Sequence, residues 1–272
     1  MENLLDKEYL HNGTDIIYKE LWNKIYMNPA NGNYTKPIGG FWTVPFYECY
    51  SEWLDYLYTH DKSMYYNALI KNNLIVKLKN NTKILIIDNE NDFKNLKDSN
   101  LTIKLNQPIP ILKFYDYVNI DEIPDYEKLA DLYDAVYVNH NSDDALFLFS
   151  VKTMLIINPN SILYYKPVSL TNDEEGEMEI LSIGKEETIK PLNRDYYELV
   201  SLIKKDFEPL INSITSLDDL KRIKELIHNK YFNNNYLEYL KGENISISDV
   251  VKVIINNIEV DNKDIIRKQL KK

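Results

Sequence analysis

Residues 36–45, Lys-Pro-Ile-Gly-Gly-Phe-Trp-Thr-Val-Pro, combine in one short stretch the residue types that a small-ligand site needs. The Gly39-Gly40 pair can adopt positive φ angles and lets a ligand approach the backbone closely. Trp42 and Thr43 then offer a flat apolar ring beside a hydroxyl group. The stretch therefore fits the start of a strand that faces a ligand. A rigid turn that leads into a buried strand, with Trp42 in the core, is the competing interpretation.

A second candidate lies nearer the start of the chain, where His11 is followed by Gly13 and Thr14. Residues 9–14 predict a short strand that ends at the glycine, and His11 lies just before this break. Its ring nitrogens are either satisfied by hydrogen bonds within the fold or available to a ligand. The two stretches form one candidate site only if the fold brings them together.

The composition limits the classes of protein and of site. A chain of 272 residues is long enough for one large domain or two modest ones. Its net charge of −10 disfavours nucleic acid as an obligate partner. The single cysteine, Cys49, cannot form an internal disulfide, and the four histidines show no metal-ligand spacing, so no metal site is expected. The N-terminus lacks a basic signal-peptide segment and no apolar run is long enough to span a membrane, which predicts a cytoplasmic protein.

The apolar pattern up to about residue 188 predicts an α+β domain built on a mixed or antiparallel sheet. Ser51 is expected to cap a helix, and Trp53 on that helix fits the core. Residues 97–124 contain several prolines and predict an ordered loop or insertion with little regular structure. The run at 83–88 is continuous, as in a buried strand. The predicted strands after residue 70 are 74–79, 83–88, 134–138, 146–149, 153–159, 162–165 and 179–183.

From about residue 189 the apolar residues recur at helical spacing. This change predicts a small all-α domain at 189–272 that follows the α+β domain at 1–188. Ser216 and Asp219 form the capping-box-like start of one of its helices. Because residues 192–272 are nearly neutral, the negative charge comes from the first domain.

The motifs, taken in order, resemble those of a family of bacterial and phage proteins that is similar in kind to the ADP-ribosyltransferase superfamily. That family has a His-x-Gly-Ser/Thr segment, a Lys-Pro-x-Gly-Gly-Leu-Trp-x-Ser-Pro segment and a helix with a tryptophan. A late Trp-Asp-x-Glu-Ser segment then leads into a strand that ends in Asn-Pro. The order is specific, while each motif alone is weak. The resemblance covers roughly residues 8–165, and its segments here are His11–Thr14, Lys36–Pro45, Ser51–Trp53, Lys83–Asp88 and Tyr133–Val136.

The resemblance implies an ADP-ribosyltransferase-like sheet domain, in which an early histidine strand, a second strand and a later glutamate strand line an NAD cleft. His11 would bond a ribose hydroxyl, and the backbone N–H and C=O groups of Gly13 would hold the carboxamide. Trp42 or a nearby tyrosine would stack on the nicotinamide ring, and Thr43 would bond a ribose or phosphate oxygen. The implied cofactor is NAD or a related nucleotide, and the implied cofactor-binding residues are His11, Gly13, Thr14, Gly40, Trp42 and Thr43.

The chain departs from the family at the glutamate that would stabilise an oxocarbenium-like ribose. Aligning the strand that ends in Asn158-Pro159 puts Lys152 at that position, where a cation opposes the developing charge. Three explanations remain open: the transferase activity has been lost, another acid does the work, or the alignment is displaced. The Asp143-Asp144 pair also fits a solvated turn, to which Lys152 would be paired. The candidate catalytic residues are His11, Asp134, Asp143 and Asp144.

Two hypotheses about function follow. The first is an ADP-ribosyltransferase-like protein that binds NAD and, if active, transfers ADP-ribose to a macromolecule. The second is a catalytically inactive version that serves as an interaction module, such as a phage or defence-related inhibitor whose acidic surface engages a basic protein partner. Phosphotransferase chemistry on an RNA 2′-phosphate, which the superfamily also hosts, is disfavoured because it needs converging basic groups in an acidic domain.

Overall fold

The computed structural model of the chain describes residues 3–13, 17, 22, 24–27, 37–47, 50–113, 116–139, 151–173, 177–189, 194–231 and 247–264. The chain divides into two compact units, one of residues 1–17 and 40–189 and the other of residues 18–39 and 190–272. One boundary, near residue 189, lies where the apolar periodicity changes. Residues 18–39 group with the C-terminal helices, whereas the predicted domain 1–188 includes them.

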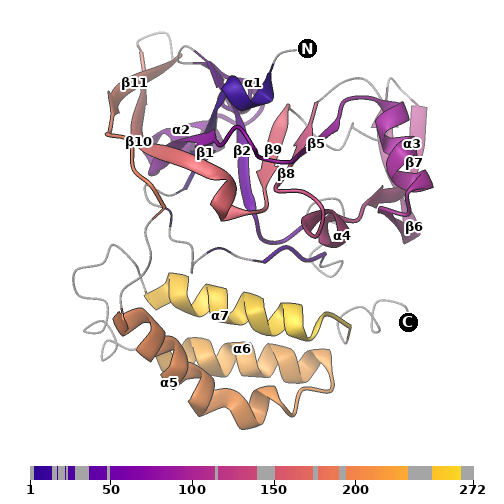
Figure 1. Cartoon of the computed structure of the whole chain (residues 1–272), viewed down its shortest axis with the longest axis vertical. Helices are drawn as coiled ribbons and strands as arrows, with labels where there is room; N and C mark the ends of the chain where they lie inside the picture. Colours follow the sequence, from indigo (N-terminus) through magenta and orange to yellow (C-terminus); the bar gives the residue numbers. More distant parts are fainter. Residues whose placement is uncertain are drawn as a thin grey trace. The chain divides into compact units, whose positions relative to one another are not determined.

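A nine-stranded sheet forms the centre of the first unit, in the order β11-β10-β4-β1-β2-β9-β8-β5, with β3 beside β2 (Figure 1). All of its described neighbours are antiparallel except β5 and β8, which are parallel. This mixed, mostly antiparallel sheet with several helices confirms the predicted α+β class. The strands are β1 (Glu8–Asn12), β2 (Phe41–Tyr47), β3 (Tyr50–Ser51), β4 (Asn73–Leu78), β5 (Ile84–Ile87), β8 (Ala135–Val138), β9 (Thr153–Ile156), β10 (Ile162–Asn172) and β11 (Met178–Ile183).

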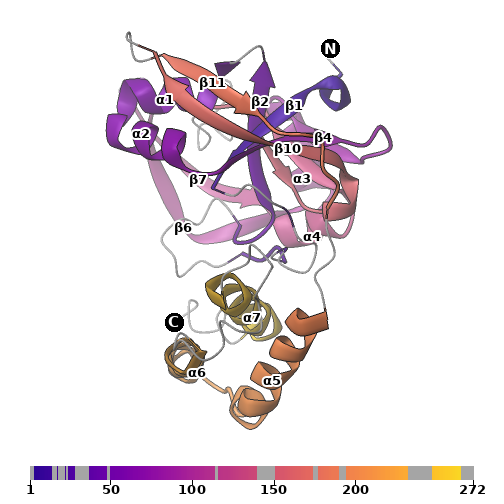
Figure 2. The same ribbon diagram turned by 90° about the vertical axis from the view of Figure 1, so that its left-hand side faces the viewer.

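Helices α1 (Glu52–His60) and α2 (Lys62–Ile70) follow β3 and cover part of the sheet (Figure 2). Ser51 occupies the N-cap position of α1, as predicted, although its buried hydroxyl makes no capping hydrogen bond. Trp53 packs partly buried against the core, as predicted. That core gathers apolar side chains from both helices and four strands: Leu10, Val44, Phe46, Leu54, Leu57, Tyr65, Ala68, Leu69, Ile75, Val168 and Leu170, with Val151 beside them.

The prediction of a loop at 97–124 is wrong. Strands β6 (Thr102–Lys113) and β7 (Asp116–Pro124) form a separate two-stranded antiparallel sheet, which lies between α3 (Glu90–Asp98) and α4 (Tyr126–Ala130) in the chain. Its register shifts between Lys104 and Ile109. A proline has no N–H to donate, so it is tolerated at such a bulge or on the outer side of an edge strand. Both strands of this sheet are edges, which explains why prolines did not prevent strand formation.

The buried strand expected at 83–88 is an edge strand. β5 ends the sheet order next to β8. Ile86 on this strand is 36% exposed, while Ile87 is fully buried. A continuous apolar run therefore did not mean burial on both sides here, because helix α3 and the neighbouring strand cover only part of β5.

The second unit contains helices α5 (Arg194–Ile211), α6 (Leu217–Tyr231) and α7 (Ile247–Asp261) (Figure 2). The predicted start of α6 is confirmed, because the Asp219 N–H donates to Ser216 Oγ at 3.1 Å and the Asp219 carboxylate accepts from the Ser216 N–H at 3.0 Å. In the described part of the chain, no helix is both long enough and apolar enough to cross a membrane. The helices bury one apolar stripe each, with Ile203, Phe207, Leu220, Ile223, Ile227, Val250 and Ile254 inside.

Tyr26 explains why residues 18–39 group with these helices. Its side chain is fully buried, and its hydroxyl donates to the Glu259 carboxylate, which also pairs with the Lys224 ammonium. A hydrogen bond to a charged group contributes about 1.5–3 kcal/mol. We therefore expect Tyr26→Phe to lower the free energy of unfolding of this unit by about that amount, measured by urea unfolding. Tyr66→Phe, which removes an exposed hydroxyl, is the control; equal stability of the two variants would contradict this role for Tyr26.

Candidate functional site

The sheet forks between β1 and β2, and this fork is the candidate site. The two strands pair from Glu8↔Phe46 to Leu10↔Val44 and no further. Beyond that point β1 continues to Asn12 against β4, while the first residues of β2, Phe41–Thr43, pair with β9. We call the region between His11–Asn12 of β1 and Phe41–Thr43 of β2 the fork. The two stretches that the sequence marked therefore lie on adjacent strands.

Backbone and amide hydrogen bonds hold the end of β1 to its β4 side. The Gly13 N–H donates to the Asn72 carbonyl at 2.8 Å, with Gly13 at a φ of 126°. The Asn12 amide donates to Asn73 Oδ1 at 2.6 Å, and Asn73 is fully buried. The expectation that the Gly13 N–H is free to hold a carboxamide is wrong, because β1 turns away from β2 at this residue and uses that N–H in the turn.

The glycine pair sets the start of β2. Gly39 and Gly40 have φ angles of 85° and 68°, which side chains other than glycine rarely adopt. Two successive positive φ angles turn the chain sharply into Phe41. The pair therefore has the unusual conformation that the sequence allowed, and Gly40 lies at the mouth of the fork.

His11 bridges the fork with its side chain. Its Nδ1 lies 2.7 Å from the Trp42 carbonyl oxygen, and its ring stacks on Phe41 with centroids 3.7 Å apart. A carbonyl oxygen only accepts, so Nδ1 carries the proton. Burial lowers the pKa of His11 from 6.5 to about 4, and the hydrogen bond to Trp42 only partly offsets this. At neutral pH the ring is therefore uncharged and Nε2 is an acceptor.

Thr43 is engaged within the sheet. Its hydroxyl donates to the Met154 carbonyl at 3.1 Å, and the residue is 2% exposed. This geometry favours the sheet-hydroxyl interpretation over a ligand contact. Trp42 differs, because it is only partly buried and its ring meets that of Tyr126 edge to face, with centroids 6.4 Å apart.

The chain has no match among protein-family models, curated proteins or solved structures.

Asp134 lies at the edge of the sheet where β2 begins, but it is two strands away, which is about 10 Å. Its carboxylate accepts from the Lys83 N–H at 2.9 Å and from the Asn158 amide at 2.7 Å. Its backbone carbonyl accepts from the N–H groups of Ile157 and Asn158. The side chain thus ties β5, β8 and the end of β9 together, which favours a structural role over a catalytic one.

Lys152 lies at the other end of β9 from the fork. It precedes Thr153, whereas Leu155 is the residue opposite Trp42, about 10 Å along the strand. Its ammonium pairs with Glu52 Oε1 at 2.7 Å, while the aspartates of the 143–144 turn, its expected partners, lie outside the described residues. The structure therefore does not bring Lys152 together with His11.

Phe41 and Asn12 are site residues that the sequence reasoning missed. The available signal for Phe41 was its place inside the marked Gly-Gly-Phe-Trp stretch, and the structure stacks its ring on His11. Thr14, His140, Asp143 and Asp144 lie outside the described residues. Over the ranges that are described, no group of three or more His, Cys, Asp or Glu side chains could hold a metal ion.

Tyr126 supplies a test of the packing beside Trp42. Its side chain is fully buried and its hydroxyl has no hydrogen-bond partner in the described part of the chain. An unsatisfied buried hydroxyl costs about 1–3 kcal/mol. We expect Tyr126→Phe to leave the free energy of unfolding unchanged or to raise it by about 1 kcal/mol, measured by urea unfolding. A clear loss of stability would mean that the hydroxyl makes a stabilising bond.

Proposed function

We propose that this chain binds NAD or a related nucleotide at the fork, in the manner of an ADP-ribosyltransferase-like protein. The observation that carries the proposal is the position of His11, whose neutral ring lies between β1 and β2 where the two strands separate. In the superfamily that the sequence resembles, an early histidine strand and the next strand line the nucleotide cleft. Here those strands are adjacent, and β9 lies on the far side of β2.

The chemistry of His11 suits a ribose hydroxyl. Because Nδ1 is committed to the Trp42 carbonyl, only Nε2 is left to meet a ligand, and a neutral Nε2 accepts a hydrogen bond. A Cβ built on Gly13 would lie 3.9 Å from Nε2, so the glycine keeps the space beside this nitrogen open. The half-buried ring of Trp42 packs edge to face on Tyr126 and, in this proposal, is the ring that would stack on the nicotinamide.

Transfer of ADP-ribose to a macromolecule would additionally need a carboxylate near the ribose. Of the acids offered by the sequence, Asp134 uses its carboxylate to tie strands together, and the Lys152 position belongs to the other end of β9. These two observations favour a second candidate function, in which the protein binds the nucleotide without cleaving it and acts as an inactive interaction module.

Incubation of the purified protein with NAD labelled separately on the adenylate and on the nicotinamide tests both functions. Retention of the adenylate label supports binding, and release of the nicotinamide label supports the transferase. His11→Asn keeps a donor to Trp42 but lacks Nε2, so we expect it to weaken binding about tenfold to a hundredfold. Thr43→Val is the matched control and should bind like the wild type. Absence of binding at millimolar NAD would overturn the proposal.

A further inference from the structure

The edge of the sheet opposite the fork carries a second group of polar side chains. Here β2 ends at Tyr47, β5 and β8 end just before Asp88 and Asn139, and β1 and β9 begin after Lys7 and Lys152. With Leu4, Ile86 and Tyr137, these residues line a cavity of about 440 Å³, which we call the lysine pocket. Its volume lies within the range of small-molecule sites.

The parallel strands β5 and β8 place two oxygen acceptors side by side in this pocket. Ile87 pairs with Val138, and the Asn139 N–H donates to the Ile87 carbonyl at 2.9 Å, so Asp88 and Asn139 follow the two strands at the same level. The crevice outside the carboxyl ends of parallel strands is where open α/β sheets bind ligands. Helix α3 begins just after Asp88.

Asn139 carries an unused acceptor. Its amide nitrogen donates to Asp88 Oδ1, which fixes the orientation of the amide group, because the reverse orientation would set two oxygens against each other. Its Oδ1 is buried and has no hydrogen-bond partner among the residues that the structure describes. Buried acceptors are rarely left without a donor, so we expect this oxygen to accept a hydrogen bond from a ligand.

Two lysines, Lys7 before β1 and Lys152 before β9, also line the lysine pocket. The Lys152 ammonium is bound by Glu52 at 2.7 Å, but an ammonium has three protons and Glu52 takes only part of that capacity. Lys7 lies with its ammonium 4.8 Å from the centre of the Tyr47 ring. Cations thus come from β1 and β9, and oxygen acceptors come from β8 and β5.

We propose that the lysine pocket binds a small phosphorylated polyol, with its phosphate at Lys7 and Lys152 and adjacent hydroxyls at Asp88 and Asn139 Oδ1. A carboxylate and an amide oxygen side by side match two neighbouring hydroxyl donors, as a ribose presents them. The phosphate could belong to a free sugar phosphate or to the ribose phosphate of a nucleotide. The site is separate from the fork, and the proposal does not rest on NAD binding there.

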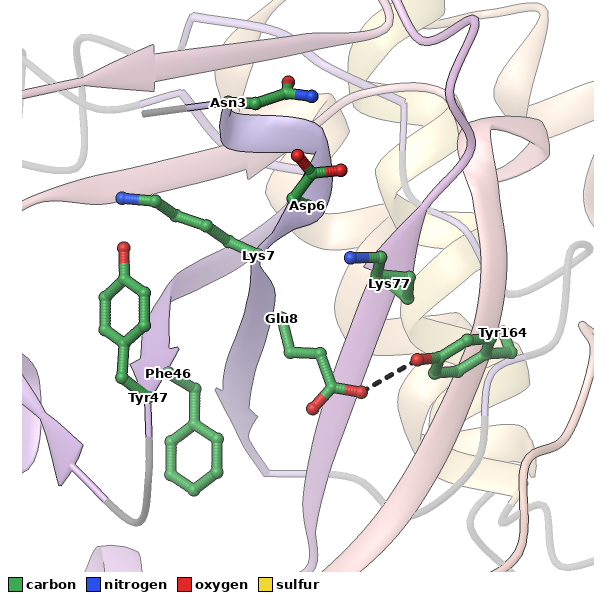
Figure 3. Close-up of a pocket in the computed structure, with 8 residues that line it drawn as sticks. All are labelled: Asn3, Asp6, Lys7, Glu8, Phe46, Tyr47, Lys77 and Tyr164. Carbon is green, nitrogen blue, oxygen red and sulfur yellow. Dashed lines mark hydrogen bonds between the residues drawn. The ribbon is translucent and has the colours of Figure 1, made fainter. Parts of the chain in front are cut away.

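The adjoining cavity of about 500 Å³, which shares Lys7 and Tyr47, fits this chemistry less well (Figure 3). Its carboxylate, Glu8, already accepts from the Tyr164 hydroxyl at 2.9 Å and from the Lys166 ammonium at 2.8 Å. Glu8 is therefore committed to bonds within the sheet, whereas Asn139 Oδ1 in the lysine pocket is not.

Calorimetric titration of the full chain with ribose 5-phosphate, AMP, ribose and inorganic phosphate tests the proposal. We expect ribose 5-phosphate to bind at least about tenfold more tightly than ribose or phosphate alone. Asp88→Asn keeps an oxygen for Asn139 but loses the charge, and Lys152→Gln keeps a donor for Glu52 but loses the cation. Each should weaken ribose 5-phosphate about tenfold or more. Stronger binding of AMP than of ribose 5-phosphate would identify the source as a nucleotide.

Lys94→Gln, on the exposed surface of α3, and His11→Asn, in the fork, are the controls and should both bind ribose 5-phosphate like the wild type. Thermal unfolding of each variant checks that it folds. No binding of ribose 5-phosphate at millimolar concentration would overturn the proposal. Equal binding of ribose 5-phosphate and phosphate, unchanged by Asp88→Asn, would also overturn it, since it would reveal an anion site only. Loss of binding in His11→Asn would show that the ligand sits in the fork instead.

Discussion

Asp134→Ala is expected to lower the free energy of unfolding of the sheet unit by about 1–3 kcal/mol. The carboxylate accepts from the Lys83 N–H in an exposed bond and from the Asn158 amide in a partly buried one, so together they contribute less than two buried bonds to a charged group at about 1.5–3 kcal/mol each. The variant leaves both donors without their acceptor at the junction of three strands. Urea or thermal unfolding of the purified protein measures the loss.

Asp131→Ala is the matched control, because this neighbouring aspartate is exposed at the end of α4. Its effect should stay within about 0.5 kcal/mol. Asp134→Asn should have an intermediate cost, since an amide can accept in only one of the two bonds. If Asp134 were the catalytic acid instead, Asp134→Asn would abolish nicotinamide release while leaving the stability close to that of the wild type.

Lowering the pH from 6.5 to 4 is expected to destabilise the wild type by about 1–3 kcal/mol more than His11→Asn. Burial sets the folded pKa of His11 at about 4, below its ordinary value of 6.5. Between these values the unfolded chain binds more protons, so the contribution of His11 is complete above pH 6.5 and is lost as the pH falls toward 4. The side chain is partly exposed, which places the effect below the full value of about 3 kcal/mol.

The measurement is the free energy of unfolding of both proteins across that pH range. The acids of the chain titrate in both, so their contribution cancels in the difference. Asn at position 11 keeps an N–H toward the Trp42 carbonyl, and it cannot gain a proton. If the difference between the two proteins did not change with pH, the pKa of His11 would be the same in the folded and unfolded states. The folded state would then not keep the His11 ring neutral, and the assignment of Nε2 as an acceptor would be contradicted.

The sequence predicted the sheet class because short apolar runs between turn residues leave few alternatives. It also marked both sides of the fork, since Gly39-Gly40 and Gly13 stand where only glycine adopts the required φ angles. The sequence-based prediction was wrong for residues 97–124, because prolines, which usually mark loops, lie here in two edge strands. The local pattern could not reveal that both strands have an open side.

Side-chain roles were harder to predict than strands. Thr43 and Asp134 are polar residues beside the expected cleft, but the hydrogen bonds that engage them come from Met154, Lys83 and Asn158, far away in the sequence. The role of Asn139 could not be predicted either, because in the sequence it is an ordinary turn residue. Only the pairing of β5 with β8 brings it beside Asp88 and leaves its oxygen unused.

The imidazole nitrogen resonances of His11, followed by NMR during an NAD titration and assigned with His11→Asn, test the central claim most directly. The free protein should show a neutral ring protonated on Nδ1 at pH 7. Addition of NAD should shift the Nε2 resonance, because that nitrogen accepts a bond from the ribose, and should leave Nδ1 nearly unchanged. An Nε2 resonance that does not move at saturating or millimolar NAD would contradict a nucleotide site at the fork.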